Sequence, residues 1–352
     1  MRHTRLHRVL CCAAFLLSPL MAQDAQNRNS YAQTNLVSDV SGLAAHTDPN
    51  LVNGWGIAFL GPGPWWVNTA GTGLSVLYDG NGNPYPHSNQ LIVTIPPPAG
   101  GGPSVPTGIV SNSSADFQIG GHASLFLFAS ARGTISGWYA GTSAQLAVTT
   151  PGAAYTGLTI GQIAGKNMLY VANFAGGVDV FDSSFNPVSL APGAFQDPML
   201  PAGYAPFNVQ SIGGSIFVMY AEVGPNGRAM PGPGLGYVDQ YTPDGTLQLR
   251  LQHGSWMNAP WGIVMAPAFG FGPLSRHLLV GQFGGGQIAA FNPSTGAFTS
   301  LMNGANGQPV NISGLWGIRF GNGVLAGSGR ALYFAAGING EADGLFGTLT
   351  HQ

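Results

Sequence analysis

Trp55-Gly56-Ile57 is the first of six similar tripeptides that are spaced almost evenly along this chain of 352 residues. The first residues of successive copies are 49 to 55 positions apart. The other copies are Thr107-Gly108-Ile109, Thr156-Gly157-Leu158, Phe207-Asn208-Val209, Trp261-Gly262-Ile263 and Trp316-Gly317-Ile318. A repeat of roughly 40–50 residues made of short strands is typical of one blade of a β-propeller. The spacing therefore predicts a six-bladed β-propeller.

Each repeat contains short β-rich runs that are separated by glycine-rich turns. In the third repeat these runs are residues 155–160, 167–173, 177–181 and 186–190, which is the pattern of a four-stranded antiparallel meander. Glycine or proline interrupts almost every window of a dozen residues, so long helices are not expected after the first 22 residues. The sequence predicts an all-β fold with about four antiparallel strands in each blade.

The two ends of the chain are expected to close the ring. Residues 316–352 provide too few strands for a full last blade, whereas residues 34–38 form a β-rich run before the first blade. An open ring would leave strand edges unpaired. We therefore expect residues 34–38 to complete the last blade beside residues 345–350, within a single propeller domain of residues 34–352.

The first 22 residues have the layout of a secretory signal peptide. Three arginines precede an apolar stretch at residues 9–20, and a small residue, Ala22, stands at the expected cleavage point. The apolar stretch is shorter than the ~20 residues of a membrane span, so no stable membrane insertion is expected after cleavage. Residues 1–22 are the predicted signal peptide and residues 23–33 a flexible segment. The protein is expected to be secreted or periplasmic.

Composition excludes several classes of function. Both cysteines, Cys11 and Cys12, lie in the predicted signal peptide, so the mature chain would have no disulfide and no cysteine nucleophile. After removal of the signal, 8 basic residues face 13 acidic ones, which argues against nucleic acid as a partner. There is no Walker loop and hence no expected nucleotide cofactor. We expect a monomer.

The propeller geometry predicts a site on one face. Residues just before each inner strand and at the end of each second strand should converge on one mouth of the central channel. Amide and carboxylate oxygens suit Ca²⁺ or another divalent cation. The alternative is that these amides cap turns and satisfy backbone groups. The candidate metal ligands are Asn53, Asn68, Asn173, Glu222, Asn258 and Gln282.

His46, Asp48 and His253 are the candidate catalytic residues. His46 and Asp48 stand two positions apart in a polar loop that leads onto the first inner strand, and His253 approaches the fifth blade in the same way. A histidine and a carboxylate at the channel mouth could act as an acid/base pair or as ligands. The structural alternative is an Asx-turn capped by Asp48.

The repeat resembles those of NHL-type and gluconolactonase-type six-bladed propellers, through its Gly-Ile inner strand and a second strand that runs into Asn-x-x-Gly. More narrowly, residues 35–57 resemble a family of secreted bacterial proteins that are mainly uncharacterised. The broader likeness implies a lactonase with a divalent cation or a lyase with a histidine. This chain departs from the lactonase pattern, because Asn53 and Trp55 stand where an acidic ligand is expected.

Two functions are open from the sequence. The first is a binding module for a small molecule, an envelope polymer or a partner, which would use the channel-mouth face. The alternative is a metal-assisted hydrolase or lyase with its site at the same mouth. The small number of acid/base residues in the mature chain favours the binding module.

Overall fold

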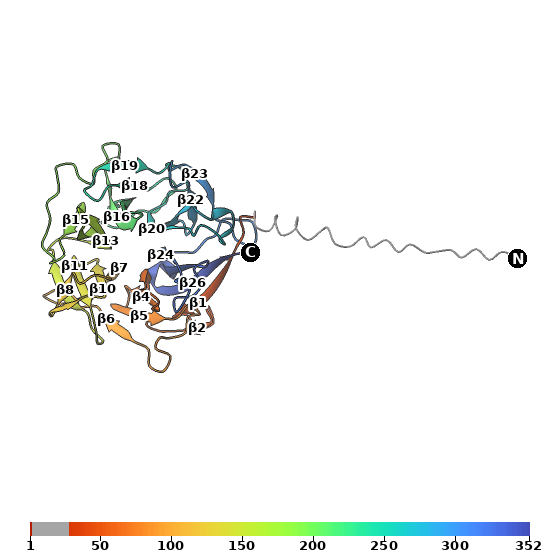
Figure 1. Cartoon of the computed structure of the whole chain (residues 1–352), viewed down its shortest axis with the longest axis horizontal. Helices are drawn as coiled ribbons and strands as arrows, with labels where there is room; N and C mark the ends of the chain where they lie inside the picture. The colour runs from red at the N-terminus through yellow and green to blue at the C-terminus, as the bar shows by residue number, and fades with distance from the viewer. Residues whose placement is uncertain (2–27) are drawn as a thin grey trace.

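Six small sheets are arranged in a ring around a central axis, as Figure 1 shows. The structure is a computed structural model that describes Met1 and residues 28–352. Residues 2–22 of the predicted signal peptide and residues 23–27 of the expected flexible segment lie outside the described residues. The six-bladed, all-β architecture expected from the repeat is confirmed.

The first three blades follow one another around the ring in chain order. Within each blade, the strands run from the channel outward in chain order. The first consists of β3 (Gly54–Ala58), β4 (Trp65–Thr69), β5 (Leu74–Tyr78) and β6 (Ile92–Thr94). The second consists of β7 (Pro106–Ser111), β10 (Phe126–Ser130), β11 (Thr134–Trp138) and β12 (Gln145–Thr149), with a small hairpin of β8 (Gln118–Ile119) and β9 (His122–Ala123) beside it. The third consists of β13 (Tyr155–Ile163), β14 (Lys166–Asn173) and β15 (Val178–Phe181).

The other three blades continue the ring. The fourth consists of β16 (Tyr204–Ile212), β17 (Ser215–Glu222), β18 (Tyr237–Tyr241) and β19 (Leu247–Arg250). The fifth consists of β20 (Pro260–Met265), β21 (Leu278–Gln282), β22 (Ile288–Phe291) and β23 (Phe298–Leu301). The sixth consists of β24 (Leu315–Phe320), β25 (Leu332–Gly337), β26 (Asp343–His351), β1 (Tyr31–Ser38) and β2 (His46–Thr47).

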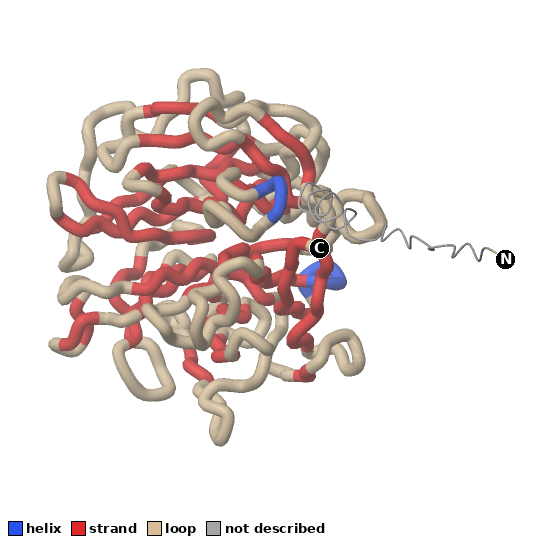
Figure 2. The backbone as a smooth tube through the Cα atoms, turned by 45° about the vertical axis from the view of Figure 1, so that its right-hand side comes forward, coloured by secondary structure: helices blue, strands red, loops and turns tan. Residues whose placement is uncertain are grey.

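Strands and loops make up almost all of the described chain, as Figure 2 shows. Its helical segments are the short turns η1 (Gly272–Leu274) and α2 (Ile338–Glu341). No helix among the described residues is long and apolar enough to cross a membrane.

The third blade has one regular strand fewer than expected. The expected fourth strand at residues 186–190 contributes a single bridge between Pro187 and Phe181 and one hydrogen bond from Val188 to Val180. Pro187 has no backbone N–H to donate, so a longer ladder cannot form there.

The ends of the chain meet in the sixth blade, as predicted. β1 pairs antiparallel with β26 over most of its length and supplies the fourth strand of this blade. β2 then adds in parallel along the outer edge of β1. The propeller is therefore closed by hydrogen bonds between its two terminal segments, which removes the free edges of an open ring.

The ordered domain begins at Tyr31 and not at residue 34, so residues 31–33 are not part of a flexible segment. The Tyr31 ring is buried against Phe271, and its hydroxyl donates a hydrogen bond of 2.8 Å to the backbone oxygen of that residue. A buried, hydrogen-bonded aromatic residue fixes the start of the strand.

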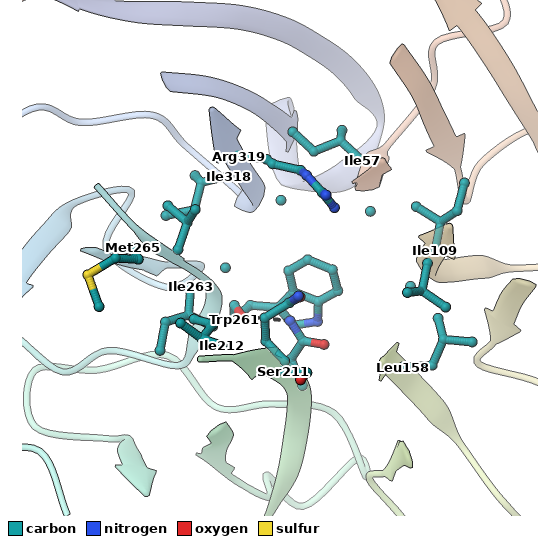
Figure 3. A pocket seen from close by; sticks show the side chains of 18 residues that line it. Ile57, Ile109, Leu158, Ser211, Ile212, Trp261, Ile263, Met265, Ile318 and Arg319 are labelled. Atoms are coloured by element: carbon teal, nitrogen blue, oxygen red, sulfur yellow. Dashed lines mark hydrogen bonds between the residues drawn. The ribbon is translucent and has the colours of Figure 1, made fainter. Parts of the chain in front are cut away.

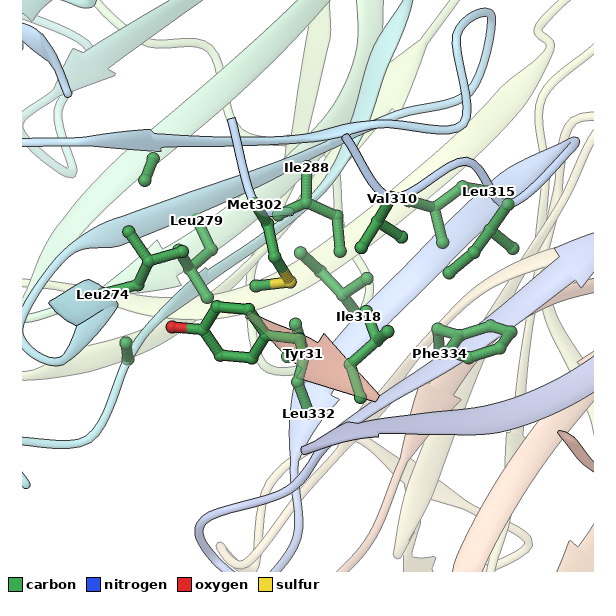
Figure 4. Close-up of a cluster of buried hydrophobic side chains, with 14 of the residues drawn as sticks. Tyr31, Leu274, Leu279, Ile288, Met302, Val310, Leu315, Ile318, Leu332 and Phe334 are labelled. Atoms are coloured by element: carbon green, nitrogen blue, oxygen red, sulfur yellow. The ribbon is translucent and has the colours of Figure 1, made fainter. Parts of the chain in front are cut away.

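The core lies mainly between neighbouring blades. In the cluster of Figure 4, Leu279 and Ile288 of the fifth blade pack with Ile318, Leu332 and Phe334 of the sixth. Each blade is thus apolar on both faces, and its stability depends on contact with its neighbours.

A β-bulge recurs at the repeated tripeptide. In every blade the register between the inner and second strands shifts at this point, for example between Gly54 and Ile57 and between Leu315 and Ile318. A bulge locally bends and twists its strand and redirects a side chain. Here the affected residue is the first of the tripeptide, which is a tryptophan in three of the six copies.

Breaking the terminal closure should destabilise the whole ring. Val37 is fully buried in β1, so Val37→Asp would place a charge in the core and lower the free energy of unfolding by at least about 3 kcal/mol. Thr34→Asp, at an exposed position of the same strand, is the control and should change it by less than about 0.5 kcal/mol. Urea denaturation measures both. Equal stability of the two variants would contradict a closure that depends on β1.

Candidate functional site

Aromatic side chains close one mouth of the central channel. Trp55 and Trp316 stack with their ring centroids 3.5 Å apart, and Trp261 meets them edge-on at 6.0 and 5.7 Å. Phe207 and Phe174 belong to the same buried cluster, called the aromatic plug below. The plug lies at the N-terminal ends of the inner strands, on the face where the sequence predicted a ligand. That mouth is therefore filled by packing.

Hydrogen bonds hold two of the three indoles of the plug, whereas the buried Trp316 Nε1–H has no hydrogen-bond partner in the described part of the chain. The Trp261 Nε1–H donates to the backbone oxygen of Thr156 at 3.0 Å and so links the fifth blade to the third. The Trp55 Nε1–H donates to Asn53 Oδ1 at 2.9 Å. These bonds and the stacking fix the plug in one arrangement.

Behind the plug, the channel forms a cavity of about 260 Å³. Its wall includes Trp261 and a ring of aliphatic side chains from successive inner strands (Figure 3). The exposed fraction rises along β20 from 4% at Trp261 to 36% at Met265. The cavity therefore opens at the C-terminal ends of the inner strands. The aliphatic ring consists of Ile57, Ile109, Leu158, Ile263 and Ile318.

Arg319 is the one charged residue among the described residues that line this cavity. Its guanidinium lies over the Phe59 ring, 4.5 Å from the centroid, and Figure 3 shows the side chain directed into the cavity. Burial lowers the pKa of Arg319 below its usual value. Within residues 28–352 no carboxylate forms an ion pair with it.

The sequence contains a signal for Arg319 that is not a cluster of polar residues. The residue after each tripeptide is Ala58, Val110, Thr159, Gln210, Val264 or Arg319. A single cation therefore occupies a position that is otherwise uncharged and repeats around the channel.

Several of the predicted metal ligands hold the ends of strands together. Asn173 Oδ1 accepts a hydrogen bond of 3.0 Å from the Ala154 N–H, and Gln282 Oε1 accepts one of 2.8 Å from the Asn258 N–H. The side chain of Asn258 in turn accepts a hydrogen bond of 2.7 Å from the Gly232 N–H. Asn258 and Gln282 are thus brought together, but the Gln282 side chain contacts the backbone of Asn258 and not its side chain.

Asn68 links two blades. Its Nδ2 donates to the backbone oxygens of Thr107 and Gly108 on the next inner strand, at 3.2 and 3.0 Å. The backbone of Asn53 lies in the left-handed region with φ of 53°, and its Oδ1 accepts the hydrogen bond from Trp55 of the aromatic plug. Both amides are buried, and Asn53 Oδ1 and Asn68 Nδ2 have structural partners, as the capping alternative describes. The Asn68 Oδ1 has no hydrogen-bond partner among the residues that the structure describes.

Glu222 ends β17 and pairs through its backbone with Tyr204. Burial raises the pKa of the Tyr204 hydroxyl, and the nearby Glu222 carboxylate adds to the effect. In the described part of the chain, no group of three or more His, Cys, Asp and Glu side chains is arranged to hold a metal ion.

His46 and Asp48 lie at the outer rim and not at the channel mouth. His46 is in β2, where it pairs with Val37 at the outermost edge of the sixth blade. The Asp48 carboxylate accepts hydrogen bonds from the Tyr78 hydroxyl at 2.7 Å and from the Asn50 N–H at 2.9 Å. The second of these bonds forms an Asx-turn. Because β2 pairs with β1 at the outer edge of the sixth blade, this loop lies away from the axis.

His253 lies between β19 of the fourth blade and β20 of the fifth, whereas His46 lies in the sixth blade. Its Nε2 is 2.8 Å from the Gly234 oxygen, and its ring stacks on Tyr237 with centroids 4.4 Å apart. The structure therefore does not bring the three candidate catalytic residues into one site.

A buried polar cluster in the fourth blade was not predicted. Arg250 lies between Asp197 and Asp239, with its Nε 3.2 Å from Asp239 Oδ1. Tyr241 donates to the other oxygen of Asp239 at 3.2 Å. Burial raises the pKa of Asp239 to about 7, with a contribution from Asp197 that Arg250 opposes.

Stability should depend on pH through Asp239. Its pKa is higher in the folded than in the unfolded state, so its contribution is complete below about pH 4 and is lost as pH rises to about 7. The free energy of unfolding should fall by up to roughly 1.4 kcal/mol per pH unit in this window. Urea denaturation of wild type and Asp239→Asn between pH 4 and pH 8 measures the slope.

Asp239→Asn should remove this slope, whereas Asp244→Asn, at an exposed turn, should keep it. The same slope in the Asp239 variant would show that another group titrates.

Comparison with known proteins places the chain among viral relatives. No protein-family model matches it. An uncharacterized protein of Acanthamoeba polyphaga mimivirus is 33% identical over 328 residues, which is 89% of this chain and 78% of the viral protein. A second mimivirus protein, also uncharacterized, is 32% identical over 332 residues, 89% of this chain and 84% of the relative. The bacterial and secreted parts of the expected resemblance stay predictions.

Solved propellers share the fold at low identity. The α-L-arabinofuranosidase of Fusarium graminearum, in complex with arabinobiose, covers 92% of this chain and 98% of its own with a TM-score of 0.57 and 9% identity. Virginiamycin B lyase from Staphylococcus aureus covers 91% of this chain and 99% of its own with a TM-score of 0.51 and 14% identity. These likenesses concern the fold alone. On the sequence matches, the chain belongs to the same family of six-bladed β-propellers as the two mimivirus proteins.

Proposed function

We propose that this protein is a non-catalytic binding module that takes a small ligand into its central channel. The observation that carries the proposal is the shape of the channel, which is closed by the aromatic plug at one end and open at the other. A cavity with one entrance suits a small molecule or the end of a longer chain, since a continuous polymer cannot pass through it.

The lining of the cavity supports a ligand with an apolar portion. Aliphatic residues from all six blades line the cavity, and a few polar residues, among them Gln210 and Ser211, line it as well. Small-molecule sites are typically concave and mostly apolar, with a small number of placed polar groups. Such a site binds by burial and needs no acid/base residue.

The alternative, a metal-assisted hydrolase or lyase, has less support. Three of the amide oxygens expected to hold Ca²⁺ or another divalent cation, those of Asn173, Asn258 and Gln282, accept hydrogen bonds from backbone N–H groups instead. From the first 22 residues we further propose that the protein is secreted or periplasmic, so that its ligand would be met outside the cytoplasm.

Octanamide, a neutral amphiphile, tests the channel. Ile109→Trp would fill part of the cavity, whereas Leu146→Trp on β12 is the control because it adds the same side chain at a position 39% exposed. We expect wild type and the control to bind octanamide with the same Kd, and Ile109→Trp to bind at least about tenfold more weakly. Calorimetry measures the Kd, and circular dichroism verifies folding.

If Ile109→Trp does not fold, Leu158→Phe makes a smaller change in the same wall. Undetectable binding to wild type, or an unchanged Kd in a folded channel variant, would contradict the proposal.

A further inference from the structure

We infer that the ligand is a small carboxylate with an apolar tail, whose carboxylate pairs with Arg319. This inference rests on the proposed function of the channel and adds the chemical class of its ligand. It is carried by a cationic side chain that faces a cavity with a ring of aliphatic side chains and lacks an acidic partner among the described residues.

The surroundings of Arg319 differ from those of the other arginines in the described chain. Arg250 and Arg228 form ion pairs with carboxylates of the protein. Those at positions 28, 132, 276 and 330 are exposed to solvent. Arg319 is neither paired nor exposed. A charge that is partly withdrawn from water gains from an anionic partner, because its desolvation is otherwise unfavourable.

The position of Arg319 fits the head group of an amphiphile. It follows Ile318 on β24, one step toward the open end of the channel, and its guanidinium is supported by the Phe59 ring. A carboxylate there would lie near the entrance while its tail extends along the aliphatic ring toward Trp261. The cavity thus offers complementary surfaces for both parts of one molecule.

The chemistry of the guanidinium selects the anion. Its planar N–H groups match the two oxygens of a carboxylate, and the hydrogen bonds strengthen where water is excluded. A metal cation would be repelled, and a simple inorganic anion would leave the aliphatic wall without a partner. Burial also lowers the pKa of Arg319, which is the direction expected of a cation without a fixed counter-charge.

Matched ligands separate the head group from the tail. At pH 7.5, octanoate should bind wild type about 10- to 100-fold more tightly than octanamide, the range expected for a hydrogen-bonded charge. Arg319→Met should remove this preference and leave the Kd of octanamide unchanged. Arg276→Met, at an exposed arginine, should keep the preference. Calorimetry in acetate-free buffer measures each Kd.

Arg319→Lys keeps the charge without the planar fork and should retain part of the preference, which provides a second test if Arg319→Met does not fold. Acetate should compete only weakly, because it lacks the tail. Equal binding of octanoate and octanamide to wild type, or an unchanged preference in a folded Arg319→Met, would overturn the inference while the channel proposal stands. Binding of neither ligand would overturn the channel proposal itself.

Discussion

The close approach of neighbouring inner strands at the glycine of the repeated tripeptide is the constraint on which the structure depends. A Cβ added at Gly262 would lie 2.5 Å from the backbone oxygen of Trp316, and one at Gly317 would lie 2.7 Å from that of Trp55. Both distances are shorter than any van der Waals contact. Glycine therefore lets the backbones of neighbouring inner strands come into contact. The six inner strands can then form one narrow ring.

The exception at Asn208 follows from the same crowding. The Asn208 side chain donates a hydrogen bond of 2.7 Å to the Trp261 oxygen and fills the space beside Gly157. It therefore links the fourth blade to its neighbours on both sides. The fourth tripeptide lacks a glycine because at this point the gap between blades is filled by a hydrogen-bonding side chain.

The ring and its closure could be predicted because both depend on repeated, local patterns. Six copies of one tripeptide give the number of blades, and an incomplete last repeat indicates that the first strand must complete it. The direction of side chains is not readable in this way. Trp55 and its equivalents turn toward the axis at a β-bulge, and whether they form a binding platform or a plug depends on how closely the rings meet.

The site was harder to predict for two physical reasons. Amides such as Asn173 and Gln282 look like ligands in the sequence, yet strand ends leave backbone N–H groups that need the same oxygens. Arg319 is the single cation at its position in the six repeats, and no cluster of polar residues surrounds it in the sequence. Its significance comes from the cavity that it faces, which only the assembled ring creates. His46 and Asp48 gather in the sequence but lie at the rim, where Asp48 accepts hydrogen bonds from Tyr78 and Asn50.

The replacement Gly317→Ala tests the central claim most directly. Alanine at a glycine outside the left-handed region ordinarily raises the free energy of unfolding by about 0.4–1 kcal/mol. Gly177→Ala is the matched control, because the added methyl group meets no atom within 4 Å. If close approach of the inner strands governs the ring, Gly317→Ala should lower the free energy of unfolding by about 1–3 kcal/mol while Gly177→Ala leaves it unchanged or raises it. A Gly317→Ala protein as stable as the control in urea denaturation would contradict the account.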